Sequence, residues 1–300
     1  MRANNPLIYF MALMTPLSTL LIAQPALSKD SNFPLIGKYL GQEPPSDNPE
    51  PFAPGIVSTQ GYEYIGLFAP DMTSFYFIRG GKDNKSQEFV TYRLIDDEWK
   101  ITDISPRAGQ PFITTDGKTM HLGRRYKERT NDGWSDVRML DAPFNDQLIM
   151  RMTASSNGTR YFDTYDEKND AFPLRYSRHI NGKFESPKPL AKHINTGTYL
   201  NHPFIAPDES YLIWDAKKDE GFGDSDLYIS YRQNDGSWGE AINLGSKINS
   251  ATWDAAGHVS PDGKYFFFNR MVKAGNENEL PNVDLYWVDA GFIEELRPKS

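Results

Sequence analysis

An internal repeat constrains this chain more than any other feature of its sequence. A turn-forming motif recurs five times, and successive copies are 45, 41, 51 and 54 residues apart. The copies are centred on Asp71, Asp116, Asn157, Asp208 and Asp262. Each is followed by apolar and aromatic residues, and such runs bounded by Pro, Asp and Gly are typical of strands joined by tight turns. The sequence therefore predicts five similar units, each with a hairpin at the motif.

A second turn signal recurs in step with the first. A polar turn followed by an aromatic residue stands at residues 97–99, 132–134, 181–184, 235–238 and 290–292, where a third and a fourth strand of each unit would meet. Four antiparallel strands in about 40–55 residues are typical of a propeller blade, because a lone sheet cannot bury both faces whereas stacked blades cover each other. In the second, shortest unit the third strand must fit into residues 125–130.

These patterns predict an all-β fold, a β-propeller of five four-stranded blades over residues 62–300. An N-terminal arm over residues 29–61 would wrap the propeller. Six blades is the alternative, if residues 52–57 form part of an extra sheet. Hydrophobic residues make up 39% of the chain, so enough apolar side chains are present for the core of such a fold.

The last two units resemble a known family of repeats. Residues 202–213 read HPFIAPDESYLI, residues 226–230 read DLYIS, and residues 260–268 read SPDGKYFFF. These stretches resemble the WD40-like β-propeller repeats of the TolB type, and residues 39–58 and 284–290 resemble uncharacterised periplasmic members. The resemblance spans about residues 39–300 and is weaker in the second and third units. It implies the propeller fold, and it suggests a non-catalytic protein that binds another protein or a glycan, although propellers also host enzymes.

The N-terminus predicts export. Residues 6–23 form an apolar run, no charged residue occurs from position 3 to 28, and Ala26 and Ser28 are small residues suited to cleavage. We therefore predict that residues 1–28 are a signal peptide; a retained transmembrane anchor is the alternative, against which Pro16 and Ser18 interrupt the run. The chain has no cysteine, which excludes disulfides, thiolate catalysis and a lipoprotein anchor. A cysteine-free exported chain favours a bacterial periplasmic or secreted protein, with no membrane span after cleavage.

The charge balance limits the classes of binding partner. Asp and Glu number 40 against 32 Lys and Arg, a formal net charge of -8. A nucleic-acid partner requires a basic surface, so that class is excluded. A protein or an oligosaccharide ligand remains.

Repeat positions place several ionisable residues at one end of the propeller axis. The first strand of each blade begins at the end where the second strand finishes, opposite the motif turns. Six residues before the motifs stand Gln110, Arg151 and His202, and eight residues after them stand Arg79, Arg124, Tyr165 and Arg270. With neighbouring positions added, we predict a ligand-binding set of His202, His258, Arg151, Gln110, Arg79, Arg124, Arg270 and Asp254.

An arginine fork matches a carboxylate, so this set predicts an anionic ligand such as an acidic sugar. The alternative is structural, with Arg79, Arg124 and Arg270 paired to carboxylates of the protein itself. If the set binds ligand, substituting His202 or Arg270 should weaken binding with little loss of stability.

The sequence contains no Gly-x-Ser-x-Gly, His-Glu-x-x-His or phosphate-binding glycine loop that would specify an enzyme. The prediction is therefore a binding module for a protein or glycan ligand, and the alternative is a lyase or hydrolase that acts on acidic oligosaccharides. We predict no cofactor. A divalent metal such as Mn or Zn at His202 and His258, with Gln110 or Asp254, is the remaining alternative.

Overall fold

The structure is a computed structural model, and it describes residues 35–80, 86–166, 171–276 and 279–299. The predicted signal peptide lies outside the described residues. Within the described part of the chain, no helix is both long and apolar enough to cross a membrane.

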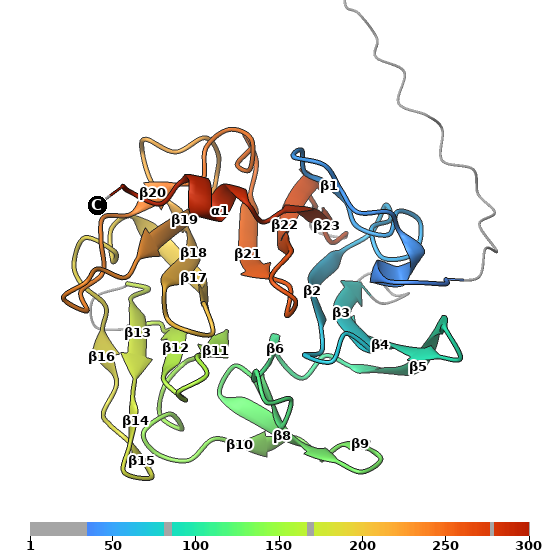
Figure 1. The fold of residues 1–300 in the computed structure, drawn as a ribbon, viewed down its shortest axis with the longest axis horizontal. Helices are drawn as coiled ribbons and strands as arrows, with labels where there is room; N and C mark the ends of the chain where they lie inside the picture. Colours follow the sequence, from blue (N-terminus) through green and yellow to red (C-terminus); the bar gives the residue numbers. More distant parts are fainter. Residues whose placement is uncertain (1–34, 81–85, 167–170, 277–278, 300) are drawn as a thin grey trace, which may run out of the picture. The chain divides into compact units, whose positions relative to one another are not determined.

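The described residues form five four-stranded antiparallel blades around a common axis, which confirms the predicted five-bladed propeller (Figure 1). Blade one contains β2 (Glu63–Phe68), β3 (Ser74–Gly80), β4 (Gln87–Ile95) and β5 (Glu98–Pro106). Blade two contains β6 (Pro111–Ile113), β7 (Thr119–Leu122), β8 (Arg125–Thr130) and β10 (Arg138–Met139), and β9 (Gly133–Trp134) pairs with β8. The short third strand expected at residues 125–130 is β8.

The remaining blades follow the same order from the axis outward. Blade three contains β11 (Met152–Ala154), β12 (Arg160–Asp163), β13 (Leu174–Ser177) and β16 (Lys188–Pro189), beside the small hairpin of β14 (His179–Ile180) and β15 (Lys183–Phe184). Blade four contains β17 (Thr198–Ile205), β18 (Tyr211–Lys217), β19 (Asp226–Tyr231) and β20 (Ile242–Asn243). Blade five contains β21 (Asp254–Val259), β22 (Tyr265–Lys273), β23 (Asn282–Asp289) and β1 (Glu50–Pro51).

The repeated Asp or Asn has the same local role in every blade. Its Oδ1 accepts a hydrogen bond from the backbone N–H two residues further on, at 2.9 to 3.3 Å, in Asp71, Asp116, Asn157, Asp208 and Asp262. A short side chain with an acceptor oxygen stabilises a tight turn in this way. The motif is therefore explained by the turn between the first two strands of each blade.

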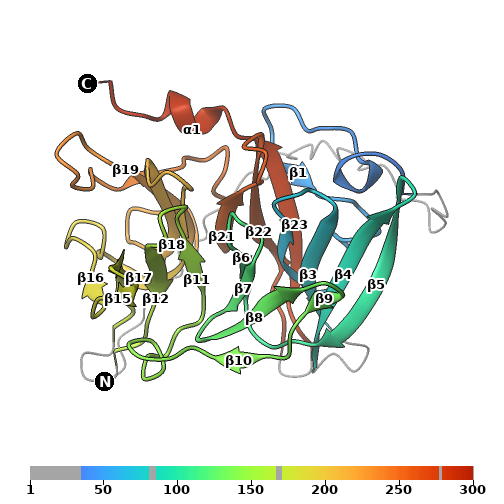
Figure 2. The same ribbon diagram turned by 60° about the horizontal axis from the view of Figure 1, so that its bottom comes forward.

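The fifth blade is completed by the N-terminal arm rather than by the C-terminus. We expected a fourth strand after the turn at residues 290–292, and this was wrong: residues Phe292–Glu295 form the short helix α1. The outermost strand is β1 from the arm, which pairs antiparallel with β23 (Figures 1 and 2). Phe52, which follows β1, is fully buried against Phe75, Phe267 and Trp287. The arm thus joins the two ends of the ring, and the six-bladed alternative is not realised.

Candidate functional site

Five polar side chains from the inner strands of the blades come together at the axis, and we call them the axial cluster: Tyr64, Gln110, Arg151, His202 and Asp215. The Nδ1 of His202 lies 2.8 Å from Asp215 Oδ1, and its Nε2 lies 2.8 Å from the Tyr64 hydroxyl and 3.3 Å from Gln110 Nε2. Because a carboxylate only accepts hydrogen bonds, His202 donates one from Nδ1 to Asp215. Its Nε2 then accepts a hydrogen bond from the Tyr64 hydroxyl. The cluster therefore joins blades one, two and four directly.

Bulges in the innermost strands explain how neighbouring blades are joined around this cluster. His202, Ala256 and Ile65 all have positive φ, of 50°, 56° and 44°. Each backbone N–H donates to a side chain on the second strand of the preceding blade: His202 to Asp163 Oδ2 at 3.1 Å, Ala256 to Asp215 Oδ1 at 2.9 Å, and Ile65 to Asn269 Oδ1 at 2.9 Å. These contacts bind blade three to four, four to five, and five to one.

Sequence reasoning missed these acceptors, although the repeat contained their signal. Asp215 and Asn269 stand seven residues after their motif residues and Asp163 stands six after its own. Tyr64, also missed, had no such signal.

The predicted residues of the innermost strands do converge, but they are buried. His202 is 3% exposed and His258 6%, while Gln110 and Arg151 are also buried. Burial and the nearby charge of Arg151 lower the pKa of His258 to about 3, so this ring is neutral at physiological pH. None of these four side chains lines the open clefts that follow.

The axial cluster is polar but gathers no metal site. Among the residues that the structure describes, no group of three or more His, Asp or Glu side chains is arranged to hold a metal ion. His202 bonds to Asp215 and Tyr64, whereas the ring of His258 packs beside Phe204 and Phe267. The divalent metal at these two histidines stays a prediction.

Three of the predicted arginines stand eight residues after a motif residue, and two of them pair with the protein's own carboxylates. Arg79 lies 2.8 Å from Glu88, and Arg270 lies 2.7 Å from buried Asp254 while donating to the carbonyl of Ile248 at 2.6 Å. Burial raises the pKa of Asp254, and the adjacent Arg270 opposes that rise. For Arg79 and Arg270 these contacts are the ones expected if the arginines pair with carboxylates of the protein itself.

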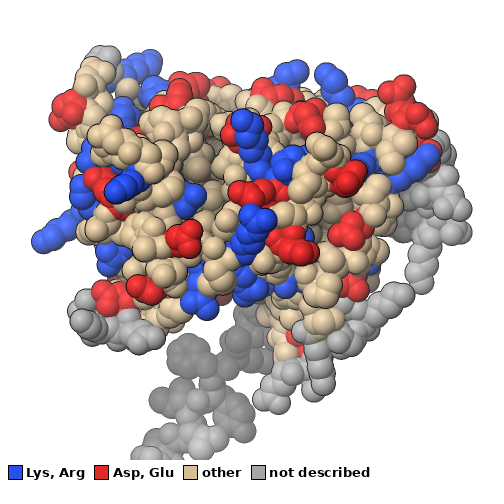
Figure 3. All heavy atoms as spheres, turned by 90° about the horizontal axis from the view of Figure 1, so that it is seen from below, with Lys and Arg blue, Asp and Glu red and all other residues tan. Residues whose placement is uncertain are grey.

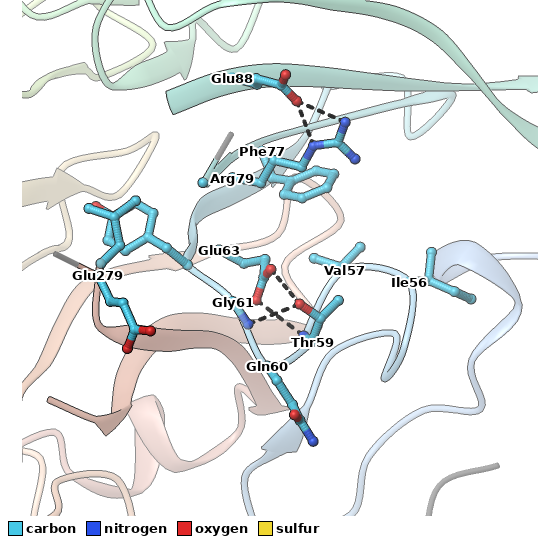
Figure 4. A pocket seen from close by; sticks show the side chains of 13 residues that line it. Ile56, Val57, Thr59, Gln60, Gly61, Glu63, Phe77, Arg79, Glu88 and Glu279 are labelled. Atoms are coloured by element: carbon cyan, nitrogen blue, oxygen red, sulfur yellow. Dashed lines mark hydrogen bonds and ion pairs between the residues drawn. The ribbon is translucent and has the colours of Figure 1, made fainter. Parts of the chain in front are cut away.

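A cleft of about 480 Å³, which we call the arm cleft, lies between the N-terminal arm, blade one and the loop before β23 (Figure 4). Arg79 and Glu88 line one side, and Glu63 lies in the cleft with its carboxylate turned to Thr59. Glu63 accepts hydrogen bonds from the Thr59 hydroxyl at 2.7 Å and the Thr59 N–H at 3.1 Å. Burial raises the pKa of Glu63 to about 7, and the charge of Asp284 adds to the effect.

Arg124 differs from the other two arginines because it has no ion pair with any described residue. It lines a cleft of about 300 Å³ together with Met150, Tyr165, Phe172 and Asn201. A second cleft of about 550 Å³ shares Tyr165 and Phe172 and continues to Tyr199. We call the combined surface the aromatic groove, formed by Arg124, Met150, Tyr165, Phe172, Tyr199 and Asn201.

The rest of the surface seen beside blades two and three has no dominant charge. Figure 3 shows this rim with Lys and Arg interspersed with Asp and Glu over a largely uncharged surface. A basic face of the kind that nucleic acid requires is not seen on this side.

Comparisons with known proteins show likeness in fold. No family model and no curated protein sequence matches the chain. Among solved structures, an oligogalacturonate lyase in complex with manganese is 12% identical, with a TM-score of 0.42 over 78% of this chain and 66% of the lyase chain. Regucalcin, a calcium-binding protein from Agrobacterium tumefaciens, is 10% identical, with a TM-score of 0.40 over 77% of this chain and 92% of its own.

The WD40 repeats of RRP9 are also 10% identical, with a TM-score of 0.37 over 82% of this chain and 99% of theirs. At these identities and TM-scores the activities of the three proteins do not transfer to this chain. The resemblance to TolB-type repeats in particular stays a prediction.

Proposed function

We propose that this chain is an exported binding module whose ligand carries a carboxylate and docks in the aromatic groove on Arg124. One observation carries the proposal. Three arginines stand eight residues after their motif residues, and two of them are neutralised within the protein while Arg124 faces an open groove. A guanidinium that no described carboxylate pairs with, beside apolar side chains, is suited to a ligand carboxylate that can accept two parallel hydrogen bonds.

The position of the groove supports the same function. Arg124 lies in the turn between β7 and β8, and Tyr199 lies at the start of β17, so both stand at the end of the propeller where the innermost strands begin. Buried Asp163 fixes the backbone beneath the groove, since it accepts the N–H groups of Met150 and Arg151 at 2.9 Å each. These two bonds hold the start of blade three in place beneath the groove, and a backbone that is already ordered lowers the entropy cost of binding.

Thermal melting with three carboxylate ligands tests the proposal: trigalacturonate, a tripeptide of glutamate and succinate. We expect at least one of them to raise the melting temperature of the wild type, less so as salt increases. Arg124→Gln should abolish the shift, whereas Arg125→Gln, the same change at the next, exposed residue, should preserve it. No shift with any of the ligands, or an equal shift in Arg124→Gln, would show that the groove does not bind carboxylates.

A second candidate function rests on the arm cleft. Glu63 has a pKa of about 7 there, and a carboxyl group that titrates near neutrality in a cleft is suited to donate or accept a proton. This observation favours the lyase or hydrolase alternative. Incubation with acidic oligosaccharides, followed by detection of new reducing ends or unsaturated sugars, tests it. Activity should vanish in Glu63→Gln and persist in Glu279→Gln, which changes an exposed carboxylate of the same cleft.

A further inference from the structure

We infer that the ligand of the aromatic groove is an oligosaccharide containing uronic acid, with its carboxylate on Arg124 and a sugar ring on the aromatic side chains. This inference rests on the proposed function and names the ligand class of the same site. The groove offers three kinds of contact that such a ligand needs: a cation, a hydrogen-bond acceptor and flat apolar surfaces.

The flat surfaces are three rings in succession. The centroids of Tyr165 and Phe172 lie 5.0 Å apart, and those of Phe172 and Tyr199 lie 5.4 Å apart. Their planes are tilted by 38° and 43°, so the rings adjoin as three successive faces along the second cleft. The face of an aromatic ring is electron-rich and attracts the C–H groups that one side of a sugar ring presents. The rings therefore favour a chain of sugars over a small free acid.

The backbone conformation at Tyr199 exposes its side chain to solvent. Tyr199 has a φ of +51° and lies at a register shift between β17 and β18, and its side chain is 56% exposed. Positive φ is unfavourable for a large aromatic residue, and bulges of this kind redirect side chains at functional positions. The Nδ2 of Asn201 donates to the Tyr199 carbonyl at 3.1 Å and supports this conformation. An aromatic side chain is thus presented to solvent at a cost in backbone energy.

Asn201 also supplies the acceptor. Its Oδ1 is buried and has no hydrogen-bond partner among the described residues, and the residue itself lines the first cleft. A buried acceptor without a partner is costly, so a hydroxyl that donates to it would favour binding. A sugar carries such hydroxyls beside its carboxylate. The two clefts, of about 300 and 550 Å³, are together in the size range of sites that enclose ligands larger than a single sugar.

Calorimetric titration with matched ligands tests the inference. Trigalacturonate has both rings and charge, its methyl ester has rings without charge, and triglutamate has charge without sugar rings. The matched variants are Arg124→Gln with Arg125→Gln as control, and Tyr199→Ala with Phe222→Ala as control, because Phe222 is exposed to a similar degree outside the groove.

We expect trigalacturonate to bind most tightly, and Arg124→Gln to weaken it about tenfold or more. Tyr199→Ala should weaken trigalacturonate and its methyl ester by about the same factor, roughly threefold to tenfold. Both control variants should bind as the wild type does.

The outcomes separate the two proposals. If Arg124→Gln weakens binding but Tyr199→Ala does not, or if triglutamate binds as tightly as trigalacturonate, carboxylate binding stands and the sugar inference is overturned. If the wild type binds none of the three ligands, both are overturned.

Discussion

Replacing Glu63 with Gln should stabilise the propeller at alkaline pH and leave it nearly unchanged in mild acid. Glu63 is 5% exposed, and burial raises its pKa from the usual 4.5 to about 7. The folded protein therefore holds this proton more tightly than the unfolded chain does. Between about pH 4.5 and pH 7 the free energy of unfolding must fall as the pH rises, because the folded state has to release a proton that it binds more strongly.

The size of the effect follows from the pKa. Each tenfold change in proton affinity corresponds to about 1.4 kcal/mol, so ionising Glu63 costs the fold about 3 kcal/mol once the pH is above its pKa. Gln carries no charge, and its amide can accept the Thr59 N–H while donating to the Thr59 hydroxyl. The variant keeps the two contacts of the side chain and loses the cost of a buried charge.

Urea unfolding from about pH 4.5 to pH 8.5 measures this difference. The curves of wild type and Glu63→Gln should converge near pH 4.5 and separate with rising pH, with the variant more stable by about 2–3 kcal/mol at pH 8. Burial also raises the pKa of Asp284 to about 6. This residue makes the free energy of unfolding fall with rising pH in both proteins. Glu43→Gln, at an exposed position of the arm, should track the wild type. Parallel curves for Glu63→Gln and wild type would refute the reasoning.

Three further changes probe the ties between blades and the groove. His202→Ala should lower the free energy of unfolding by about 2–4 kcal/mol in urea, because buried groups of three blades lose their shared partner; little loss of stability would instead agree with the ligand-binding role predicted from the sequence. Phe52→Ala should cost about 3–5 kcal/mol in the same assay, since this fully buried ring packs where the arm closes the propeller. Gly123→Ala should lower both stability and affinity for trigalacturonate, because a Cβ there would lie 2.5 Å from the Ile149 carbonyl oxygen. Gly117→Ala, with the same φ of +70° and open space around it, should cost only about 1–2 kcal/mol and leave affinity unchanged.

The repeat was sufficient to predict the propeller because turns and strands are local features. The spacing of the motif residues gave the number of blades, and the acceptor oxygen of each one explains its turn. The closing strand could not be found in this way, because β1 has only two residues and its pairing with β23 depends on the whole ring being formed. Likewise, the sequence indicated the position of Arg124 and Tyr165 but not that of Phe172, which comes from a loop, or of Tyr199, which lies at a bulge that the motif spacing does not mark.

The shortness of the second unit explains why the groove lies there. In blade one, Arg79 stands within a long hairpin and faces Glu88 across β3 and β4, and in blade five Arg270 stands opposite Asp254 across β21 and β22. In blade two, β7 ends at residue 122 and β8 begins at residue 125, so Arg124 lies in the turn and has no residue opposite it. The arginine at this repeat position is ion-paired in blades one and five, whereas in blade two it has no carboxylate opposite it. The short connection between β7 and β8 thus leaves Arg124 in an open cleft, where the proposed ligand can reach it.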